Sequence, residues 1–264
     1  MNNLKSKRLF LLDMDGTIYL DDDLFDGTLD FLAHVKSIGG RYLFLTNNSS
    51  KGIDKYVEKL HRLGIEAVED DFLTSTDATI AYLKQKGHKK IYAFGTASFK
   101  RQLCAAGLPI TDKLEDGIDC LCLSNDQELT FKKLEDASIL LLKHDVEYIA
   151  TNPDWVCPTA FGSVPDCGSI CDMLRHVSGK WPKFIGKPEP DMVYSALERT
   201  GYGKDEALMI GDRLYTDIAC GVNAGIDSAF VLSGEGTLKD LEESDKKPTF
   251  VFDNIRAILD EIIK

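Results

Sequence analysis

Short, continuously apolar runs separated by helix-length segments constrain the fold of this chain more than any other feature. The runs are four residues long and lie at 9–12, 42–45, 91–94, 207–210 and 229–232. Uninterrupted runs of this kind indicate strands that are buried on both faces, as in parallel sheets. The segments between them space their apolar residues as helices do, at 29–38, 56–63, 77–86, 191–200 and 216–224. This alternation predicts an α/β fold built on a doubly wound parallel sheet.

The middle of the chain is less regular. It predicts short strands at 120–123 and 148–150, and helices at 134–142 and 170–177. After Trp181-Pro182 the strand and helix rhythm returns, and it ends with a strand and a helix from Phe250 onward. We therefore predict a discontinuous core, formed by residues 1–75 and 182–264, that carries an inserted α/β domain at 76–181.

Charge and composition exclude several classes of protein. The 264 residues include 31 basic and 43 acidic side chains, a net charge of −12, whereas nucleic-acid polymers are bound by surplus Lys and Arg. Hydrophobic residues make up 44% and charged residues 28%, which is typical of a globular chain with a sizeable core. The first eight residues lack the apolar part of a secretion signal, and no apolar run reaches the ~18 residues of a membrane span. These features predict a cytoplasmic protein without a membrane partner, with its seven cysteines reduced.

Polar residues follow the apolar runs, at the strand ends where open α/β sheets bind their ligands. Asp13-Met14-Asp15-Gly16 follows the first run, and Gly211-Asp212 follows a later one. Alternate residues of an extended segment point to one side, so Asp13 and Asp15 face one cavity. Two carboxylates held together repel each other unless a cation compensates them. With Asp212 as a third oxygen ligand, the pattern suits Mg²⁺.

Hydrogen-bond donors follow the second run and the return from the inserted domain. They are the hydroxyl of Thr46, the amides of Asn47 and Asn48, and the ammonium of Lys187. Such groups bind an anion. Carboxylates, a divalent cation, a lysine and a hydroxyl together describe a phosphoryl-transfer site, in which a carboxylate can act as the nucleophile.

These residues, taken in order, resemble the four motifs of the haloacid dehalogenase-like hydrolases. The motifs are Asp13-Met14-Asp15-Gly16-Thr17, then Thr46, then Lys187, then Gly211-Asp212 through Asp217. The short sequence segments around Thr46, Asn152, Lys187 and Asp212 resemble more narrowly those of the NagD and p-nitrophenyl-phosphatase branch of that superfamily. One departure is Ser124-Asn125-Asp126, where the branch commonly has a glycine before the aspartate. The resemblance implies a Rossmann-like core with an α/β cap, and a Mg²⁺-dependent phosphatase.

The resemblance also implies a role for each motif residue. Asp13 is the nucleophile and a metal ligand; Asp15 is the general acid and then the base, and offers its backbone carbonyl to the metal. Thr46 binds the phosphoryl group with the help of Asn47 and Asn48, and Lys187 neutralises that group. Asp212 binds Mg²⁺. Asp217 either orients the metal shell or caps the helix after Thr216.

Several alternatives remain open at the level of sequence. A phosphomutase shares the core chemistry but returns the phosphoryl group to a second hydroxyl. A receiver-like signalling module also combines acidic residues, a threonine and a lysine, but it has no acid two residues after its phosphorylated aspartate and needs only one small domain. Asn152 and Asp154 either shape an Asn-Pro turn or contact the small phosphorylated substrate from the cap. The cap is also the candidate surface for a homo-oligomer.

Overall fold

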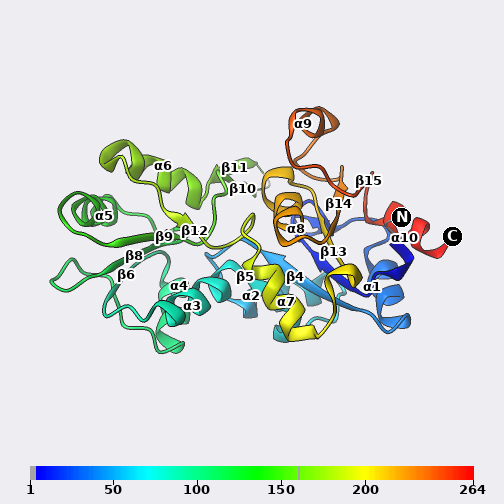
Figure 1. Cartoon of the computed structure of the whole chain (residues 1–264), viewed down its shortest axis with the longest axis horizontal. Coiled ribbons are helices and arrows are strands. Elements are labelled where there is room, and N and C mark those ends of the chain that lie inside the picture. Colours follow the sequence, from blue (N-terminus) through cyan, green and yellow to red (C-terminus); the bar gives the residue numbers. More distant parts are fainter. Residues whose placement is uncertain (1–3, 160) are drawn as a thin grey trace. The chain divides into compact units, whose positions relative to one another are not determined.

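The computed structural model describes residues 4–159 and 161–264, which form two compact units (Figure 1). The first unit contains the chain up to Thr46, Ile53–Leu73 and Lys187–Lys264. The second contains Asn47–Gly52 and Thr74–Gly186. Both are α/β units, as the alternating pattern of the sequence predicts.

The sheet of the first unit has the strand order β15-β14-β13-β1-β4-β5. Its strands are β1 (Leu9–Leu12), β4 (Arg41–Thr46), β5 (Phe72–Thr74), β13 (Ala207–Gly211), β14 (Asp227–Val231) and β15 (Phe250–Phe252). The fully buried β1 pairs in parallel with β4 on one side and with β13 on the other, so strand order reverses at β1. A reversal of this kind leaves a crevice for ligands at the carboxyl ends of the strands.

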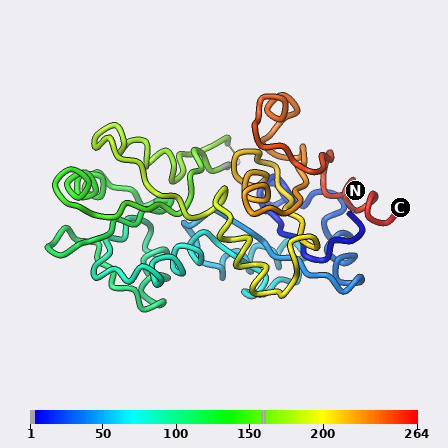
Figure 2. The backbone as a smooth tube through the Cα atoms, in the orientation of Figure 1, coloured from blue at the N-terminus to red at the C-terminus, as the bar shows by residue number. Residues whose placement is uncertain are grey.

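Helices cover both faces of this sheet. The helices of the first unit are α1 (Thr28–Ser37), α2 (Ile53–Arg62), α7 (Asp191–Thr200), α8 (Ala219–Ala224), α9 (Leu238–Glu243) and α10 (Ile255–Ile263). Phe10 and Leu208 share one apolar cluster with side chains of α1, α2 and α10. Met209, the alternate residue, faces Gly221 of α8, so α8 lies on the opposite face. Figure 2 shows the beginning of the described chain beside its end, where the turn Leu4–Ser6 packs on α10.

Two local features of the first unit differ from the regular pattern. A hairpin of β2 (Tyr19–Leu20) and β3 (Asp23–Leu24) follows β1, with Asp21 in a left-handed conformation at φ 49°. The helix that the sequence predicts at 216–224 begins as a regular helix only at Ala219. A π-helical turn, Leu214–Ile218, precedes it. Wide turns of this kind frequently occur at functional sites.

The second unit has its own parallel sheet, in the order β12-β9-β8-β6-β7. The strands of the unit are β6 (Ile91–Phe94), β7 (Ile110–Thr111), β8 (Cys120–Leu123), β9 (Glu147–Ala150), β12 (Lys183–Phe184) and the separate hairpin β10 (Val156–Thr159) and β11 (Gly162–Pro165). Alternation along β8 divides its side chains between two apolar clusters. Leu121 and Leu123 pack against α5 (Phe131–Lys143) and α6 (Cys167–Ser178), whereas Cys120 and Cys122 pack against α3 (Ser75–Lys86) and α4 (Ala97–Ala105). The unit is therefore a sheet between two helical layers.

The ends of α3 illustrate how local sequence positions these elements. Thr74 accepts a hydrogen bond from the backbone N–H of Asp77, and the Asp77 carboxylate accepts one from the N–H of Thr74. This reciprocal cap fixes the start of the helix. Gly87 ends it at φ 69°, a conformation that residues with a side chain adopt at a cost.

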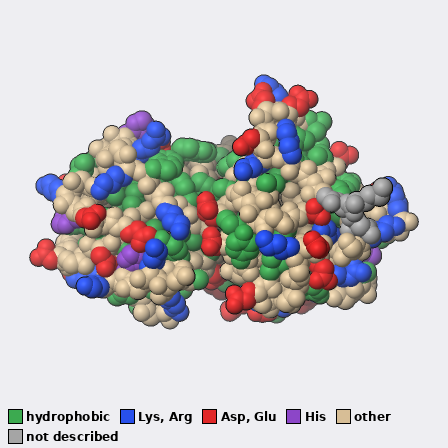
Figure 3. All heavy atoms as spheres, in the orientation of Figure 1, with side chains coloured by type: hydrophobic (Ala, Val, Ile, Leu, Met, Phe, Trp, Pro, Cys, Tyr) green, Lys and Arg blue, Asp and Glu red, His purple; other side chains and the backbone are tan. Residues whose placement is uncertain are grey.

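The surface agrees with the charge balance of the sequence. The face shown in Figure 3 intersperses basic and acidic side chains instead of forming a basic stripe. Within the two described stretches, no helix is both long and apolar enough to cross a membrane.

Candidate active site

Lys187 joins the ends of three strands of the first unit. Its Nζ lies 2.6 Å from Oδ1 of Asp13, which follows β1, and 2.6 Å from Oδ1 of Asp217, which follows β13. It also donates a hydrogen bond of 3.0 Å to the carbonyl of Leu45 in β4. The side chain is 2% exposed. A buried ammonium is therefore fixed at the carboxyl edge of the sheet, next to the point where strand order reverses.

Backbone groups hold Asp212 at the same edge. Its Oδ2 accepts from the N–H of Glu235 at 2.7 Å, and its carbonyl accepts from the N–H of Gly236 at 3.1 Å. Glycine is needed around this carboxylate because a Cβ on Gly16 would lie 2.5 Å from its Oδ2, and a Cβ on Gly234 closer still. Gly16 also has φ +88°, which makes any substitution there strained. The close approach of two loops thus fixes the orientation of Asp212.

Three carboxylates form one cluster with an excess of negative charge. Ligand oxygens of Asp13, Asp212 and Asp217 lie within 4.8 Å of one another. Burial and the charges of Asp13 and Asp217 raise the pKa of Asp212 to about 8. Burial and Asp13 raise the pKa of Asp217 to about 6, against the opposing effect of Lys187. A divalent cation bound to these oxygens would relieve the repulsion, so the donor set fits a hard cation such as Mg²⁺.

Lys187 stays charged in this cluster. Burial alone would favour the neutral amine, but the carboxylates of Asp13 and Asp217 outweigh burial and raise the pKa of Lys187 above its ordinary value. For Asp13 the balance is reversed: burial raises the pKa of its carboxyl, although Lys187 lowers it. Lys187 and Asp13 therefore form a buried ion pair, and the neighbouring charged groups affect the pKa values of both residues.

Asp217 lies in the π-helical turn, and both of its oxygens are engaged. Oδ1 accepts from Lys187, and Oδ2 accepts from the N–H of Arg213 at 3.1 Å. The guanidinium of Arg213 in turn forms an ion pair of 2.8 Å with Glu235. Asp217 is thus placed to orient Lys187 and the Asp212 loop.

The remaining motif residues of the first unit lie at the same strand ends. Asp15 lies two residues beyond Asp13, and its side chain is 37% exposed. Thr46 is the buried last residue of β4 and directly follows Leu45, the acceptor for Lys187. The structure therefore brings Asp13, Lys187, Asp212 and Asp217 into direct or near contact, with Asp15 and Thr46 on adjoining positions of the same two strand ends.

Asn47, Asn48, Asn152 and Asp154 belong to the second unit. Asn47 Nδ2 donates to Asp154 Oδ2 at 2.7 Å, and Asn152 Nδ2 donates to the same oxygen at 2.8 Å. Asn48 Oδ1 accepts from the backbone N–H of Ser50 at 3.0 Å and from its hydroxyl at 2.7 Å. Through these hydrogen bonds the four residues brace loops inside the second unit.

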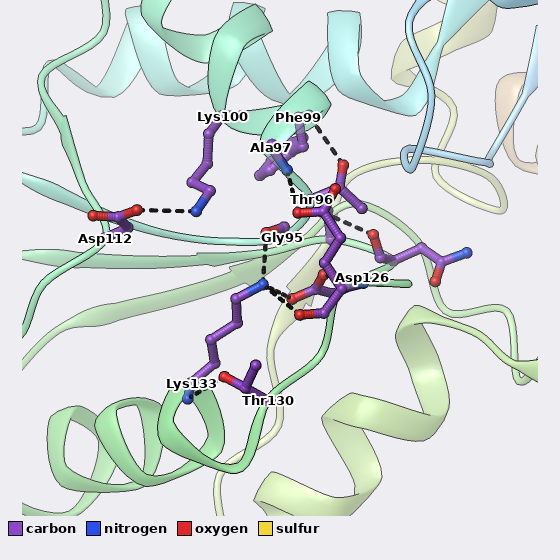
Figure 4. A network of polar contacts seen from close by, with 12 residues as sticks. Gly95, Thr96, Ala97, Phe99, Lys100, Asp112, Asp126, Thr130 and Lys133 are labelled. Atoms are coloured by element: carbon purple, nitrogen blue, oxygen red, sulfur yellow. Dashed lines mark hydrogen bonds and ion pairs between the residues drawn. The ribbon is translucent and has the colours of Figure 1, made fainter.

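A second polar network surrounds Asp126, in the segment where the sequence departs from the branch. Lys133 lies 2.6 Å from Asp126 and also donates to the carbonyls of Gly95 and Glu128 at 3.2 and 3.0 Å (Figure 4). The Glu128 carboxylate accepts from the N–H of Ala97 at 2.9 Å, at the start of α4. The network ties the ends of β6 and β8 to α4 and α5.

Some residues around the site were not predicted from the sequence. Glu235 follows β14, so the rule that ligands gather at carboxyl ends of strands would have included it. Its contact with Asp212 is made by a backbone N–H, which any residue type provides. Tyr19 and Lys59 approach Asp15 from the hairpin and from α2, and neither lies at a predicted strand end.

Two family models match the parts of the chain that contain Asp13, Thr46, Lys187 and Asp212. The haloacid dehalogenase-like hydrolase model matches residues 10–109, and a HAD-hydrolase-like model matches residues 184–258. An acid sugar phosphatase of Staphylococcus aureus is 34% identical over 262 residues, which cover 99% of this chain and 100% of the relative. Relatives of full length that are phosphatases favour an enzyme over a receiver-like module.

Solved structures agree with this relationship. A 4-nitrophenylphosphatase from Thermotoga maritima is 42% identical, with a TM-score of 0.91 over 98% of each chain. A glycerol phosphate phosphatase from Mycobacterium tuberculosis, in complex with calcium, is 28% identical, with a TM-score of 0.89 over 97% of this chain and 75% of its own. The predicted fold and the family resemblance are both confirmed. The chain belongs to the haloacid dehalogenase-like hydrolases, and within them it is a phosphoric monoester hydrolase.

Proposed function

We propose that the protein is a Mg²⁺-dependent phosphatase of small phosphorylated metabolites, and that it works through an aspartyl-phosphate on Asp13. The observation that carries this proposal is the contact of the buried Lys187 with Asp13 beside Asp212 and Asp217. A carboxylate attacks phosphorus well when a fixed cation orients it and neutralises the approaching phosphoryl oxygens.

The reaction proceeds in two transfers. An oxygen of Asp13 attacks phosphorus and forms an acyl-phosphate bond while the ester P–O bond breaks. Asp15 gives its proton to the departing alkoxide, and Thr46 and Lys187 bind the transferring phosphoryl oxygens. Water then attacks phosphorus and loses its proton to Asp15, which releases phosphate and restores the Asp13 carboxylate.

Asp13, Asp212 and the backbone carbonyl of Asp15 are the residues that we assign to Mg²⁺ binding. When bound, the ion compensates the carboxylates and the phosphate charge. The M. tuberculosis relative has also been solved in complex with magnesium, which supports this choice of cation.

We assign substrate selectivity to the second unit, because the residues of the proposed chemistry are all in the first. Relatives that act on sugar phosphates, 4-nitrophenyl phosphate and glycerol phosphate support a small phosphate monoester as substrate. A phosphate-release screen over sugar phosphates, nucleotides, phosphoglycolate, glycerol phosphate and pyridoxal phosphate would rank the candidates.

Trapping the covalent intermediate tests the mechanism. The enzyme is mixed with substrate, quenched, and reduced with borohydride, which converts an aspartyl-phosphate into homoserine. We expect homoserine at position 13 in the wild-type protein and none in Asp13→Asn. Free phosphate as the final product supports the phosphatase, whereas stoichiometric isomerisation of a sugar phosphate would replace it with a phosphomutase.

A further inference from the structure

A lysine that belongs to none of the motifs lies beside Asp15. Lys59 Nζ is 3.7 Å from Oδ1 of Asp15, and it lies over the ring of Tyr19 at 3.7 Å from the centroid. The hydroxyl of Tyr19 donates to Oδ2 of the same carboxylate at 3.4 Å. Each oxygen of Asp15 therefore has its own partner, one cationic and one a neutral donor.

The two partners are themselves fixed. Tyr19 is fully buried, and its carbonyl accepts from the N–H of Gly16 at 2.8 Å, which closes the turn after Asp15. Burial and the neighbouring Asp15 raise the pKa of Tyr19 well above its ordinary value, so its hydroxyl remains a donor. Lys59 extends from α2. This helix is anchored because Tyr56, which precedes Lys59 in the sequence, and Leu60, which follows it, both pack into the apolar core of the first unit.

We propose that Lys59, together with Tyr19, is a positioning residue that holds the Asp15 carboxyl group where it meets the leaving-group oxygen. The inference rests on the proposed role of Asp15 as general acid. Such an acid must come within ~2.6–3.2 Å of the oxygen that it protonates, and a displacement of ~1 Å costs on the order of 10²-fold in rate. Because the Asp15 side chain is 37% exposed, the polar contacts of its two oxygens help to set its orientation.

The arrangement gives each aspartate of the Asp13-Met14-Asp15 motif a separate lysine. Lys187 is buried against Asp13, whereas Lys59 is 22% exposed and contacts Asp15 and the Tyr19 ring. The two lysines therefore affect different bonds. Loss of Lys187 disturbs attack on phosphorus for every substrate, whereas loss of Lys59 disturbs proton donation to the leaving group.

Substrates with different leaving groups separate these effects. We compare kcat/KM for glycerol phosphate, whose alkoxide must be protonated, with that for p-nitrophenyl phosphate, whose leaving group needs little help. This constant covers the steps up to departure of the leaving group, so hydrolysis of the intermediate does not mask the comparison. In Lys59→Met we expect a loss of at least tenfold on glycerol phosphate and of less than threefold on p-nitrophenyl phosphate.

Matched variants control the comparison. Lys55→Met removes a lysine from the same helix that, within residues 4–159 and 161–264, forms ion pairs only with Asp54 and Glu58, and we expect it to change neither constant. Lys59→Arg, which keeps the charge over Tyr19, should restore glycerol phosphate turnover to within about threefold of wild type. Tyr19→Phe removes only the hydroxyl and should show the same substrate bias to a smaller degree, which provides a second variant if Lys59→Met folds poorly.

The decisive measurement is a double-mutant cycle with Asp15→Asn. If Lys59 acts through Asp15, adding Lys59→Met to Asp15→Asn should cause no further loss on glycerol phosphate. Equal losses on both substrates in Lys59→Met, or a full additional loss in the double variant, would overturn the inference. If Asp15→Asn itself showed no bias between substrates, the acid role in the proposed function would fail instead.

Discussion

Each unit contains a lysine that forms an ion pair of 2.6 Å with an aspartate, but the two pairs lie in opposite charge environments. In the second unit Lys133 meets one carboxylate, that of the fully buried Asp126, and two backbone carbonyls. In the first unit Lys187 meets two carboxylates, and a third belongs to the same cluster. The charges of Lys133 and Asp126 cancel in the second unit, whereas the carboxylates around Lys187 in the first unit exceed its single positive charge.

This difference distinguishes the Lys133–Asp126 pair from the pair that we propose to be reactive, although both lie at the carboxyl ends of parallel strands. A buried pair that is balanced and fully hydrogen-bonded mainly specifies local geometry. A cluster with surplus negative charge raises the pKa values of its carboxyl groups, and perturbed pKa values are a common property of functional sites. Charge balance, in addition to fold position, therefore supports the proposal that the cluster in the first unit is the active site.

The largest expected effect comes from replacing the nucleophile. Asp13→Asn keeps the size of the side chain but removes its nucleophilic oxygen, so kcat should fall by on the order of 10³-fold or more, with the fold intact. Circular dichroism and phosphate release measure the two properties. Asp126→Asn is the matched change in the second unit, and we expect its kcat on p-nitrophenyl phosphate to stay within about threefold of wild type. If a folded Asp13→Asn protein hydrolysed substrate at the wild-type rate, Asp13 would not be the nucleophile and would not differ in role from Asp126.

Replacing the lysine of the first unit should have the next largest effect. Lys187→Met leaves Asp13 and Asp217 without their cation, so Asp13 retains a proton more readily and the phosphoryl oxygens lose a fixed charge. We expect kcat/KM to fall by roughly 10²-fold on glycerol phosphate and p-nitrophenyl phosphate alike. Steady-state kinetics on both substrates checks this, and retention of both constants within about threefold would contradict the assignment of Lys187.

The stability of the metal-free protein should depend on the same surplus of carboxylates. The folded pKa of Asp212, about 8, and that of Asp217, about 6, lie above the ordinary 3.8, so the folded state holds protons that the unfolded chain has lost. Stability should therefore fall as pH rises from about 4 to 8. Because Mg²⁺ requires ionised ligands, its stabilising effect should grow over the same interval.

Thermal unfolding between pH 5 and pH 8, with EDTA or with excess Mg²⁺, measures this dependence. Asp212→Asn is the control that removes one of the titrating groups, so its melting temperature in EDTA should decline less with pH. Identical slopes for the wild type and Asp212→Asn would show that the carboxylate cluster does not govern the pH dependence.

The sequence predicts those features of the fold and the site that depend on a local pattern of apolar and polar residues. The runs at 9–12 and 207–210 predict central strands because parallel strands are apolar on both faces. The carboxyl-end rule then places Asp13 and Asp212 at one edge. The hairpin β2–β3 was missed because two-residue strands carry no detectable alternation. The helix at 216–224 was predicted too early, because apolar spacing does not distinguish the π-helical turn from a regular start.

Contacts between distant side chains were the least predictable part. Lys59 is one of several polar residues on α2, and only the packing of that helix decides which of them meets Asp15. The pairing of Asn47 with Asp154 likewise joins residues 107 positions apart. Short motifs specify which residue types can react, whereas tertiary packing decides which neighbours hold them.

The smallest expected effect is on the balanced pair of the second unit. In Lys133→Met the buried Asp126 carboxylate keeps, among the described residues, only its hydrogen bond from the N–H of Glu128. Since Lys133 itself is 19% exposed, we expect a loss of about 1–3 kcal/mol in the free energy of unfolding, or several degrees in melting temperature. In contrast to Lys187→Met, kcat on p-nitrophenyl phosphate should change by less than about threefold. The double variant Asp126→Asn/Lys133→Met should recover part of the lost stability, because it leaves no unpaired charge behind. If Lys133→Met lowered kcat as much as Lys187→Met did while the melting temperature stayed constant, the balanced network would itself be part of the catalytic machinery, and charge balance would no longer separate the two units.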